Sequence, residues 1–437
     1  MLTVATAEAF TTDIAAVPNR ALAIGADERL DLAATVGLSR IETVSYLGAS
    51  YIAVHFAEFA LPAGDFVVVH SPNNSSAAAT HFYDGKGSDG RGDFIASLVP
   101  GDTAIVQYIS STNSSSRLNV SVSKSSESAP AITRLAFKIS SFSRGLPTTS
   151  TAIGDKEIIC GAGDNSRPAK CYVIARPEIY RKARAVARLV IGGTKVCTGW
   201  LAGSGRYVIT NNHCISNVAT AAKVEFEFGA ESDSRDSTAC EGQLACRKTP
   251  VATTSTLVLT NVALDYAVVK LPETADVSAY GYLQYRPSGP VVREQIYIPQ
   301  HPEGFVKCIS VVVDNGSVAK IESLAAASSC GGTNRVGYLA DTETGSSGSP
   351  VLAMSDNTVV ALHNCGGCLN AGVSIVQIVA HMKDNNVVLP DFAIPTSAPT
   401  QTPKPLVADR GSGLSEVLCS EFLCEWSDAS ASCSSFQ

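Results

Sequence analysis

Short strand-like segments recur along most of this chain. Runs rich in Val, Ile, Thr and Ser are separated by Gly, Asn and Asp, a pattern that favours β-strands over long helices. Of the 437 residues, 45% are hydrophobic and only 17% are charged, as in a globular protein. The strand-like segments predict an all-β protein. Because the length exceeds what one ordinary hydrophobic core can serve, the sequence also predicts several domains.

Composition divides the chain into five parts. The first part contains no cysteine and carries alternating apolar segments such as Tyr51 to Phe56, which predict an N-terminal β-sandwich. A later stretch alternates Pro with Thr, Ser and Ala, which predicts an extended linker. The predicted parts are the sandwich (1–147), a junction with a short helix (148–184), a second β-rich domain (185–390), the linker (391–413) and a small cysteine-containing tail (414–437).

Thirteen cysteines, clustered in the second half, predict disulfides and an extracellular location. Cys160 with Cys171 and Cys240 with Cys246 are candidate local pairs. Zinc is the alternative interpretation of Cys365-Gly-Gly-Cys368, but no second pair stands at zinc-ribbon spacing, so no metal site is predicted. The secretory route also fits the glycosylation acceptors of the form Asn-X-Ser/Thr, which are Asn73, Asn74, Asn113, Asn119 and Asn315.

Several functions are not supported by the charge and hydropathy patterns. The net charge is −7 and no basic stripe is present, so nucleic acid is not a predicted partner. The sequence contains no run of eighteen apolar residues, so no membrane span is predicted. The segment after Met1 lacks the basic and long apolar regions of a signal peptide, so it predicts none.

Three segments of the second domain carry chemistry. A strand from Tyr207 ends at His213, and the next residue, Cys214, is placed to pair with Cys197 on the adjacent strand. Asp265 stands at the head of an apolar strand, where its carboxylate can be buried and hydrogen-bonded. Ser347 lies in a Gly/Ser turn before another apolar strand.

Together these residue types suit nucleophilic catalysis. A serine hydroxyl needs an imidazole to accept its proton, and the imidazole needs a carboxylate to orient it. A glycine before the nucleophile lets two backbone N–H groups converge on one point. Those of Gly345 and Ser347 would stabilise the oxyanion. Taken singly, Ser347, His213 and Asp265 would each fit a structural role, and it is their conjunction that points to catalysis.

The three segments resemble the signatures of the trypsin/chymotrypsin superfamily. They are Thr-Asn-Asn-His-Cys, Leu-Asp-Tyr-Ala-Val-Val-Lys-Leu and Gly-Ser-Ser-Gly-Ser-Pro-Val, and they occur in the order His, Asp, Ser of that superfamily. The last form is similar to that of the microbial lysyl and glutamyl endopeptidases. The resemblance covers about 185–390 and implies a chymotrypsin-like double β-barrel, without a cofactor, that hydrolyses proteins or peptides.

Three further roles follow from this resemblance. Asp341 lies six residues before Ser347, where trypsins hold a carboxylate at the floor of the S1 pocket; an Asp that only fixes its own loop is the alternative. His363 is placed like the histidine with which glutamyl endopeptidases receive a substrate carboxylate, and Gly366 with Gly367 would form an open edge strand for the substrate. Ser346 stands where animal trypsins carry Asp, which implies that activation by an N-terminal ion pair is absent.

The sequence therefore predicts a secreted serine endopeptidase, with cleavage after basic residues or after Glu both open. An inactive homologue that acts as a secreted binding protein is the alternative. The sandwich is a candidate for contact with a surface or a carbohydrate, and also for an intramolecular inhibitor or folding aid.

Overall fold

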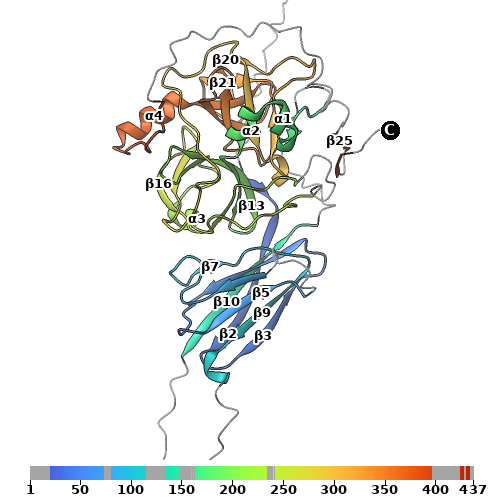
Figure 1. Cartoon of the computed structure of the whole chain (residues 1–437), viewed down its shortest axis with the longest axis vertical. Helices are drawn as coiled ribbons and strands as arrows, with labels where there is room; N and C mark the ends of the chain where they lie inside the picture. Colours follow the sequence, from blue (N-terminus) through green and yellow to red (C-terminus); the bar gives the residue numbers. More distant parts are fainter. Residues whose placement is uncertain are drawn as a thin grey trace, which may run out of the picture.

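Antiparallel sheets make up most of the computed structural model. It describes residues 20–72, 80–114, 134–147, 159, 161, 163–233, 240, 242–395, 424–427 and 430–433. The predicted all-β class is confirmed: a β-sandwich precedes a chymotrypsin-like pair of β-barrels (Figure 1). No helix in the described part of the chain is long and apolar enough to span a membrane.

The sandwich of the first domain consists of two sheets with alternating inward apolar residues. One sheet has the spatial order β2 (Gly25–Thr35), β10 (Leu135–Gly145), β4 (Tyr51–Ala57) and β7 (Phe94–Ile95), with β8 (Val99–Pro100) also paired to β4. The other has the order β3 (Arg40–Ser45), β9 (Thr103–Ile109), β5 (Phe66–His70) and β6 (Thr80–Tyr83).

Aromatic rings fill the space between these two sheets. Phe56 of β4 lies with its ring centroid 5.2 Å from Phe59, 5.2 Å from Phe94 and 5.3 Å from Phe137. Burial of such rings dominates the energetics of a core, and their edge-to-face contacts add to it. The alternating pattern seen in the sequence therefore forms a core that belongs to the first domain.

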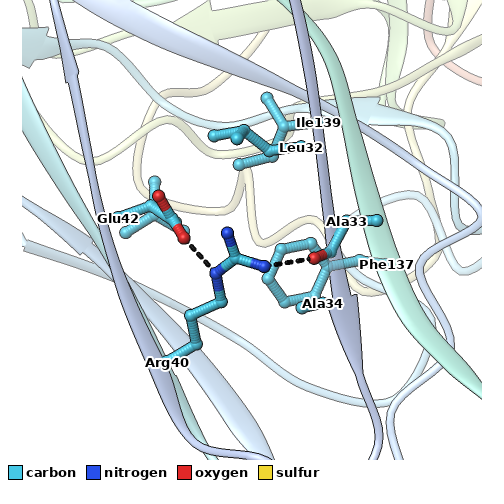
Figure 2. Close-up of a pocket in the computed structure, with 8 residues that line it drawn as sticks. Leu32, Ala33, Ala34, Arg40, Glu42, Phe137 and Ile139 are labelled. Atoms are coloured by element: carbon cyan, nitrogen blue, oxygen red, sulfur yellow. Dashed lines mark hydrogen bonds and ion pairs between the residues drawn. The ribbon is translucent and has the colours of Figure 1, made fainter.

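A hollow at the rim of this core lies beside β2 and β3 (Figure 2). Arg40 donates to the Glu42 carboxylate and to the Ala33 carbonyl oxygen, so the polar groups drawn there satisfy one another. The remaining lining residues are apolar: Leu32, Ala34, Val106, Phe137 and Ile139. The hollow belongs to the sandwich and contains none of the residues predicted to carry chemistry.

The second domain contains two larger sheets. The first has the spatial order β15 (Val224–Glu227), β12 (Val186–Ile191), β13 (Lys195–Ala202), β14 (Tyr207–Thr210), β17 (Tyr266–Lys270) and β16 (Thr256–Asn261), and β1 (Leu22–Ala23) also pairs with β13. The second has the order β11 (Arg167–Pro168), β19 (Cys308–Ser310), β18 (Ile296–Gln300), β22 (Pro350–Ala353), β23 (Val359–Cys365), β24 (Asn370–Ser374), β21 (Arg335–Tyr338) and β20 (Ile321–Ala326).

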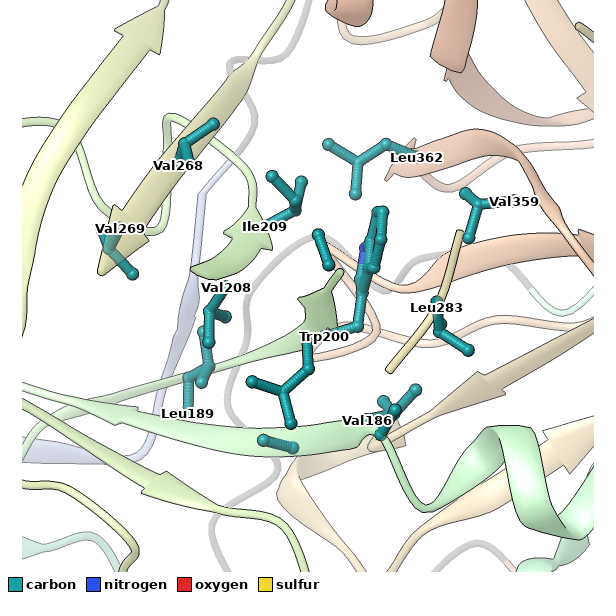
Figure 3. Packing of buried hydrophobic residues seen from close by; sticks show 14 of the residues in the cluster. Val186, Leu189, Trp200, Val208, Ile209, Val268, Val269, Leu283, Val359 and Leu362 are labelled. Carbon is teal, nitrogen blue, oxygen red and sulfur yellow. The ribbon is translucent and has the colours of Figure 1, made fainter. Parts of the chain in front are cut away.

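Trp200 lies where the two sheets of the second domain meet. Its side chain is fully buried, and Tyr285 packs edge-on against it with ring centroids 5.8 Å apart. Figure 3 shows the indole among aliphatic side chains from both sheets, including Leu362 and Val359 of β23 and Ile209 of β14. One core therefore joins the strands that carry the candidate catalytic residues.

Helices are few and short among the described residues. They are α1 (Tyr172–Ala175), α2 (Pro177–Ala183), α3 (Val218–Ala221) and α4 (Ile375–Asp384), with 3-10 turns at Ser111–Ser114, Ala169–Cys171 and Pro302–Gly304. The α2 helix lies in the junction (148–184), where a short helix was predicted, with Pro177 at its first turn, where the missing N–H costs nothing. In the tail, β25 (Cys424–Ser427) pairs with β26 (Ser430–Cys433).

Candidate active site

His213 lies just beyond the end of β14, beside a disulfide. Strands β13 and β14 are antiparallel neighbours, and Cys197 on β13 is bonded to Cys214, with 6.2 Å between the two Cα atoms. The cross-link ties the residue next to His213 to the neighbouring strand. Since both sulfurs are in the bond, neither is a thiolate that could hold a metal beside this histidine.

Asp265 orients His213 through two hydrogen bonds. The His213 Nδ1 atom lies 2.8 Å from Asp265 Oδ2, and the backbone N–H of His213 donates to Asp265 Oδ1 at 3.0 Å. The Asn211 side chain also donates to the Asp265 carbonyl oxygen at 2.8 Å. With both carboxylate oxygens facing His213, the imidazole is held with Nδ1 toward the acid and Nε2 pointing away from it.

The Nε2 atom of His213 is buried and makes no hydrogen bond to any residue that the structure describes. A buried polar atom without a partner is costly, so each such atom calls for an explanation. The atom is therefore available to take a proton from a nearby hydroxyl, which is the role of a general base.

Ser347 lies in a turn that rests directly on β13. Its carbonyl oxygen accepts the Thr198 N–H at 2.9 Å. The same oxygen lies 4.0 Å from the Sγ atom of Cys214, and Cys214 directly follows His213. Gly348 has a φ of +92°, and a Cβ there would come within 2.1 Å of the Thr198 carbonyl oxygen. Only glycine fits at this position, which explains the Gly/Ser turn seen in the sequence.

Gly345, two residues before Ser347, is held from two sides. Its carbonyl oxygen accepts the Thr198 hydroxyl at 2.9 Å, and that hydroxyl itself accepts the His301 N–H at 3.1 Å. On the other side, a Cβ on Gly345 would lie 3.0 Å from the His301 carbonyl oxygen and 3.1 Å from the Gly304 nitrogen. With its φ of +102°, and with so little room for a Cβ, this position suits glycine.

Asn364 is a residue of the site that the sequence analysis missed. Its side-chain nitrogen lies 3.4 Å from Asp265 Oδ2, and its side chain is almost completely buried on β23. An amide that donates to a carboxylate helps to hold that carboxylate in its orientation. Asn364 lies 99 positions from Asp265, so the sequence showed no sign of this contact. The only signal of a role was its place next to His363.

The Asp341 carboxylate is engaged from within the chain. Its Oδ2 atom accepts the Asn165 N–H at 2.9 Å and the Asn165 side-chain amide at 3.0 Å. Burial of the carboxyl raises its pKa to about 6, although the Asn165 donors lower it. These contacts favour the alternative of a structural Asp over a free carboxylate at the floor of an S1 pocket. The partner, Asn165, belongs to the junction and not to the loop of Asp341 itself.

We expect Asp341→Asn to stabilise the protein at high pH only. A carboxyl whose folded pKa of about 6 exceeds its unfolded value contributes stability that is fully present below about pH 4 and is lost as the pH rises through 6. Asn cannot ionise and retains an acceptor for Asn165. The variant should therefore exceed wild type by about 1–3 kcal/mol in free energy of unfolding at pH 8. At pH 4 the two proteins should match.

Urea unfolding at both pH values measures this difference. Asp314→Asn is the matched control, because Asp314 also accepts from the Asn165 amide, at 2.8 Å, but is exposed. It should show no gain at pH 8. Equal stability of Asp341→Asn and wild type at pH 8 would contradict the expected cost of the buried charge.

His363 is fully buried on β23, where its Nδ1 atom lies 2.8 Å from the Tyr338 hydroxyl. Its backbone bonds to the nucleophile turn, because the Gly348 N–H donates to the His363 carbonyl oxygen at 3.0 Å. His363 thus lies beside the turn, as a residue lining the substrate site would, with one ring nitrogen already engaged.

The predicted edge strand at Gly366 and Gly367 is wrong. Strand β23 ends at Cys365 and is internal, with β22 and β24 as its neighbours. Gly366 and Gly367 follow it in a turn, where the Ser329 hydroxyl donates to the Gly366 carbonyl oxygen at 3.1 Å. A contact of Gly366 with substrate stays a prediction.

Three disulfides occur among the described residues, and disulfide bonding of the chain is confirmed. Besides Cys197–Cys214, they are Cys240–Cys246, as the local pairing predicted, and Cys330–Cys365, which was not predicted. Because Cys365 is bonded to Cys330, the Cys365-Gly-Gly-Cys368 segment does not present a pair of thiolates, and the zinc alternative is wrong. The Cys160 end of the other predicted pair lies outside the described residues.

Known proteins are similar to this chain over the part that carries the site. The family described as a trypsin-like peptidase domain matches residues 197–362. The chain is 42% identical over 340 residues to "Secreted RxLR effector protein 73" of Plasmopara viticola, over 77% of this chain and 79% of that protein.

Two solved protease structures match about half of this chain at low sequence identity. One is an inactive form of Rv3671c from M. tuberculosis H37Rv, with 14% identity and a TM-score of 0.37, over 53% of this chain and all of that one. Another is a Glu endopeptidase, with 18% identity and a TM-score of 0.35, over 53% of this chain and 99% of that one.

Proposed function

Because residues 197–362 belong to the trypsin-like peptidase domain family, we propose that the protein is a secreted serine endopeptidase in which Ser347, His213 and Asp265 form the catalytic triad. One observation carries the proposal. The His213 imidazole is bonded to Asp265 at 2.8 Å on one side and keeps a buried nitrogen without a described partner on the other, beside the turn of Ser347.

In the proposed reaction, His213 Nε2 takes the proton of Ser347 Oγ as that oxygen attacks the substrate carbonyl carbon. The negative charge moves to the carbonyl oxygen, where the backbone N–H groups of Gly345 and Ser347 stabilise it. His213 then gives its proton to the leaving amine, and an acyl group remains on Ser347. Water, deprotonated by His213, releases this acyl group and restores the serine.

Asp265 acts through His213 in this scheme. Its carboxylate holds Nδ1–H and stabilises the imidazolium that forms during each proton transfer. Asn364 and Asn211 are positioning residues, because they bond to Asp265 and not to the reacting groups.

Substrate preference rests on two candidate residues. Cleavage after Lys or Arg depends on Asp341, whose carboxylate is already bonded to Asn165; cleavage after Glu depends on His363. Matched chromogenic peptides with Arg, Lys, Glu or Phe before the scissile bond separate these possibilities. Asp341→Asn should abolish a preference for Arg and Lys, and His363→Ala a preference for Glu.

Export from the cell is supported by the disulfides and by the name of the secreted relative. Asn315 lies in an exposed turn, as a glycosylation acceptor would. Contact of the first domain with a surface or a carbohydrate stays a prediction from the sequence.

Labelling with a fluorophosphonate tests the proposed function. We expect the wild-type protein to form a covalent adduct at Ser347, and His213→Ala to react at least about 100-fold more slowly, since general-base catalysis contributes about 10²–10⁴-fold. Peptide mapping identifies the labelled serine. A wild-type protein that is folded but takes up no label would favour the alternative of a secreted binding protein.

A further inference from the structure

We propose that the first domain is a permanent part of the peptidase, which holds the loop behind Gly345 in position. That loop, residues 301–304, is called the backing loop here. The proposal rests on the proposed function, because Gly345 matters only where an oxyanion forms. It differs from a removable inhibitor or folding aid in that the first domain remains necessary in the mature enzyme.

The first domain joins the second by strand pairing and by a shared apolar core. Strand β1 pairs with β13 through Leu22 and Val196, and Figure 1 shows the chain reaching from the sandwich into the upper domain at this point. The Tyr51 hydroxyl donates to the Gly193 carbonyl oxygen at 2.7 Å. A buried cluster then crosses the boundary; its first-domain members include Ile24, Tyr51, Ala53 and Leu98, and its second-domain members are Val190, Val196 and Leu244.

The backing loop rests on the second-domain side of this same cluster. The Leu244 N–H donates to the Gly304 carbonyl oxygen at 3.1 Å, and the Gln243 side chain donates to the Glu303 carbonyl oxygen at 2.9 Å. Gly304 also lies against Val196, whose methyl groups would be 3.4 Å from a Cβ at that position. Leu244 and Val196 therefore touch the first domain on one side and the backing loop on the other.

A buried chain of ion pairs reinforces the contact. The Arg188 guanidinium donates to the Gly304 carbonyl oxygen at 3.0 Å and to Glu227 at 2.8 Å. Arg247 donates to the other oxygen of Glu227 at 2.6 Å and is also paired with Glu225. Glu227 and Arg188 are completely buried. Buried ion pairs have narrow geometric requirements, so these linked ion pairs specify where Gly304 lies.

The positive charge of Arg247 also affects a side chain of the first domain. Burial, together with the positive charge of Arg247, lowers the pKa of His81 on β6 to about 4. His81 is therefore neutral at physiological pH, so its imidazole adds no positive charge near the Arg247 guanidinium.

The backing loop in turn contacts the turn of the nucleophile. The Glu303 N–H donates to the Thr344 carbonyl oxygen at 2.7 Å, and His301 and Gly304 pack against Gly345. A misplacement of about 1 Å at a reacting centre can reduce the rate by roughly 10²-fold. Loss of the first-domain contact is thus expected to lower the rate of acylation and to leave substrate binding largely intact.

Two leucines of the first domain allow a matched test in the full chain. Leu98 belongs to the cluster that crosses the boundary, whereas Leu61 is buried within the sandwich core. We expect Leu98→Ala to lower kcat per titrated active site about 10-fold, with KM changed less than 2-fold, as for an interaction made in the transition state. Leu61→Ala should keep the wild-type kcat. Titration of active sites removes any effect of a smaller folded fraction.

Tyr51→Phe and Tyr108→Phe form a second, milder matched pair. Tyr51→Phe loses the hydrogen bond to Gly193 across the domain boundary, whereas Tyr108→Phe, the control, loses one to Asp65 inside the sandwich. Hydrogen exchange of the 301–304 and 344–345 amides is a second readout that needs no activity. Leu98→Ala and Tyr51→Phe should speed this exchange, and the two control variants should not. Equal kcat and equal exchange in Leu98→Ala and Leu61→Ala would overturn the proposal. Faster exchange in Leu98→Ala, together with a wild type that takes up no fluorophosphonate label, would instead support the coupling and reject the peptidase.

Discussion

Replacing Ser347 by alanine is expected to reduce kcat for peptide hydrolysis by about 10⁶-fold, the loss that follows removal of the nucleophile in serine peptidases. The reason is that no acyl-enzyme can form without the hydroxyl. The fold should persist, because the turn depends on the glycine at 348 and on the Thr198 bond to the Ser347 carbonyl oxygen. Initial rates per mole of folded protein measure the effect.

Ser346→Ala is the matched control for this prediction. Ser346 is the buried neighbour of Ser347, and its hydroxyl accepts the Glu343 N–H at 3.3 Å. Its loss should change kcat by less than about 10-fold, since a single neutral hydrogen bond contributes about 0.5–1.5 kcal/mol. Residual hydrolysis above 1% in Ser347→Ala would place the nucleophile elsewhere.

The largest effect on stability is expected at Trp200. Trp200→Ala should lower the free energy of unfolding by about 3–5 kcal/mol, because it removes a fully buried indole from the core that joins both sheets of the second domain. The edge-on contact with Tyr285 is lost as well. Urea unfolding followed by circular dichroism measures the change, since the substitution removes one of the two tryptophans of the chain.

Trp200→Phe separates packing from polar effects. The indole N–H of Trp200 has no hydrogen-bond partner within the described structure, so phenylalanine loses volume but no hydrogen bond. We expect a smaller loss, about half that of the alanine variant, in line with the smaller cavity. A loss of less than about 1 kcal/mol in Trp200→Ala would show that the two sheets do not depend on this shared core.

Local patterns explain what the sequence analysis found. The alternation of apolar residues predicts strands, because side chains alternate between the two faces of a sheet. His213 before Cys214, Asp265 at the head of a strand, and Ser347 between glycines are each visible within a few residues. The charged stretch with Pro177 at its start likewise predicts a short helix without any information from the rest of the fold.

The errors arose where a prediction needed the partner of a residue. Gly366 follows Cys365, and the sequence does not show that Cys365 is bonded to Cys330, 35 positions away. Without that bond, the Gly-Gly pair fits an edge strand, and Cys365 with Cys368 fits a metal site. In the structure, Gly366 lies beyond the end of β23, and both Cys365 and Cys368 are disulfide-bonded.

The sequence by itself determined the all-β class and the three segments from which the candidate triad is built, because each depends on the conformational preferences of neighbouring residues. Only the tertiary structure decided how those segments are supported. Asn165 meets Asp341 across 176 positions, and Arg188 meets Gly304 across 116. Such contacts form when the sheets and the two domains pack, since hydrogen bonds and buried charges are satisfied by whichever groups the packing brings near, and no local pattern specifies which groups those are.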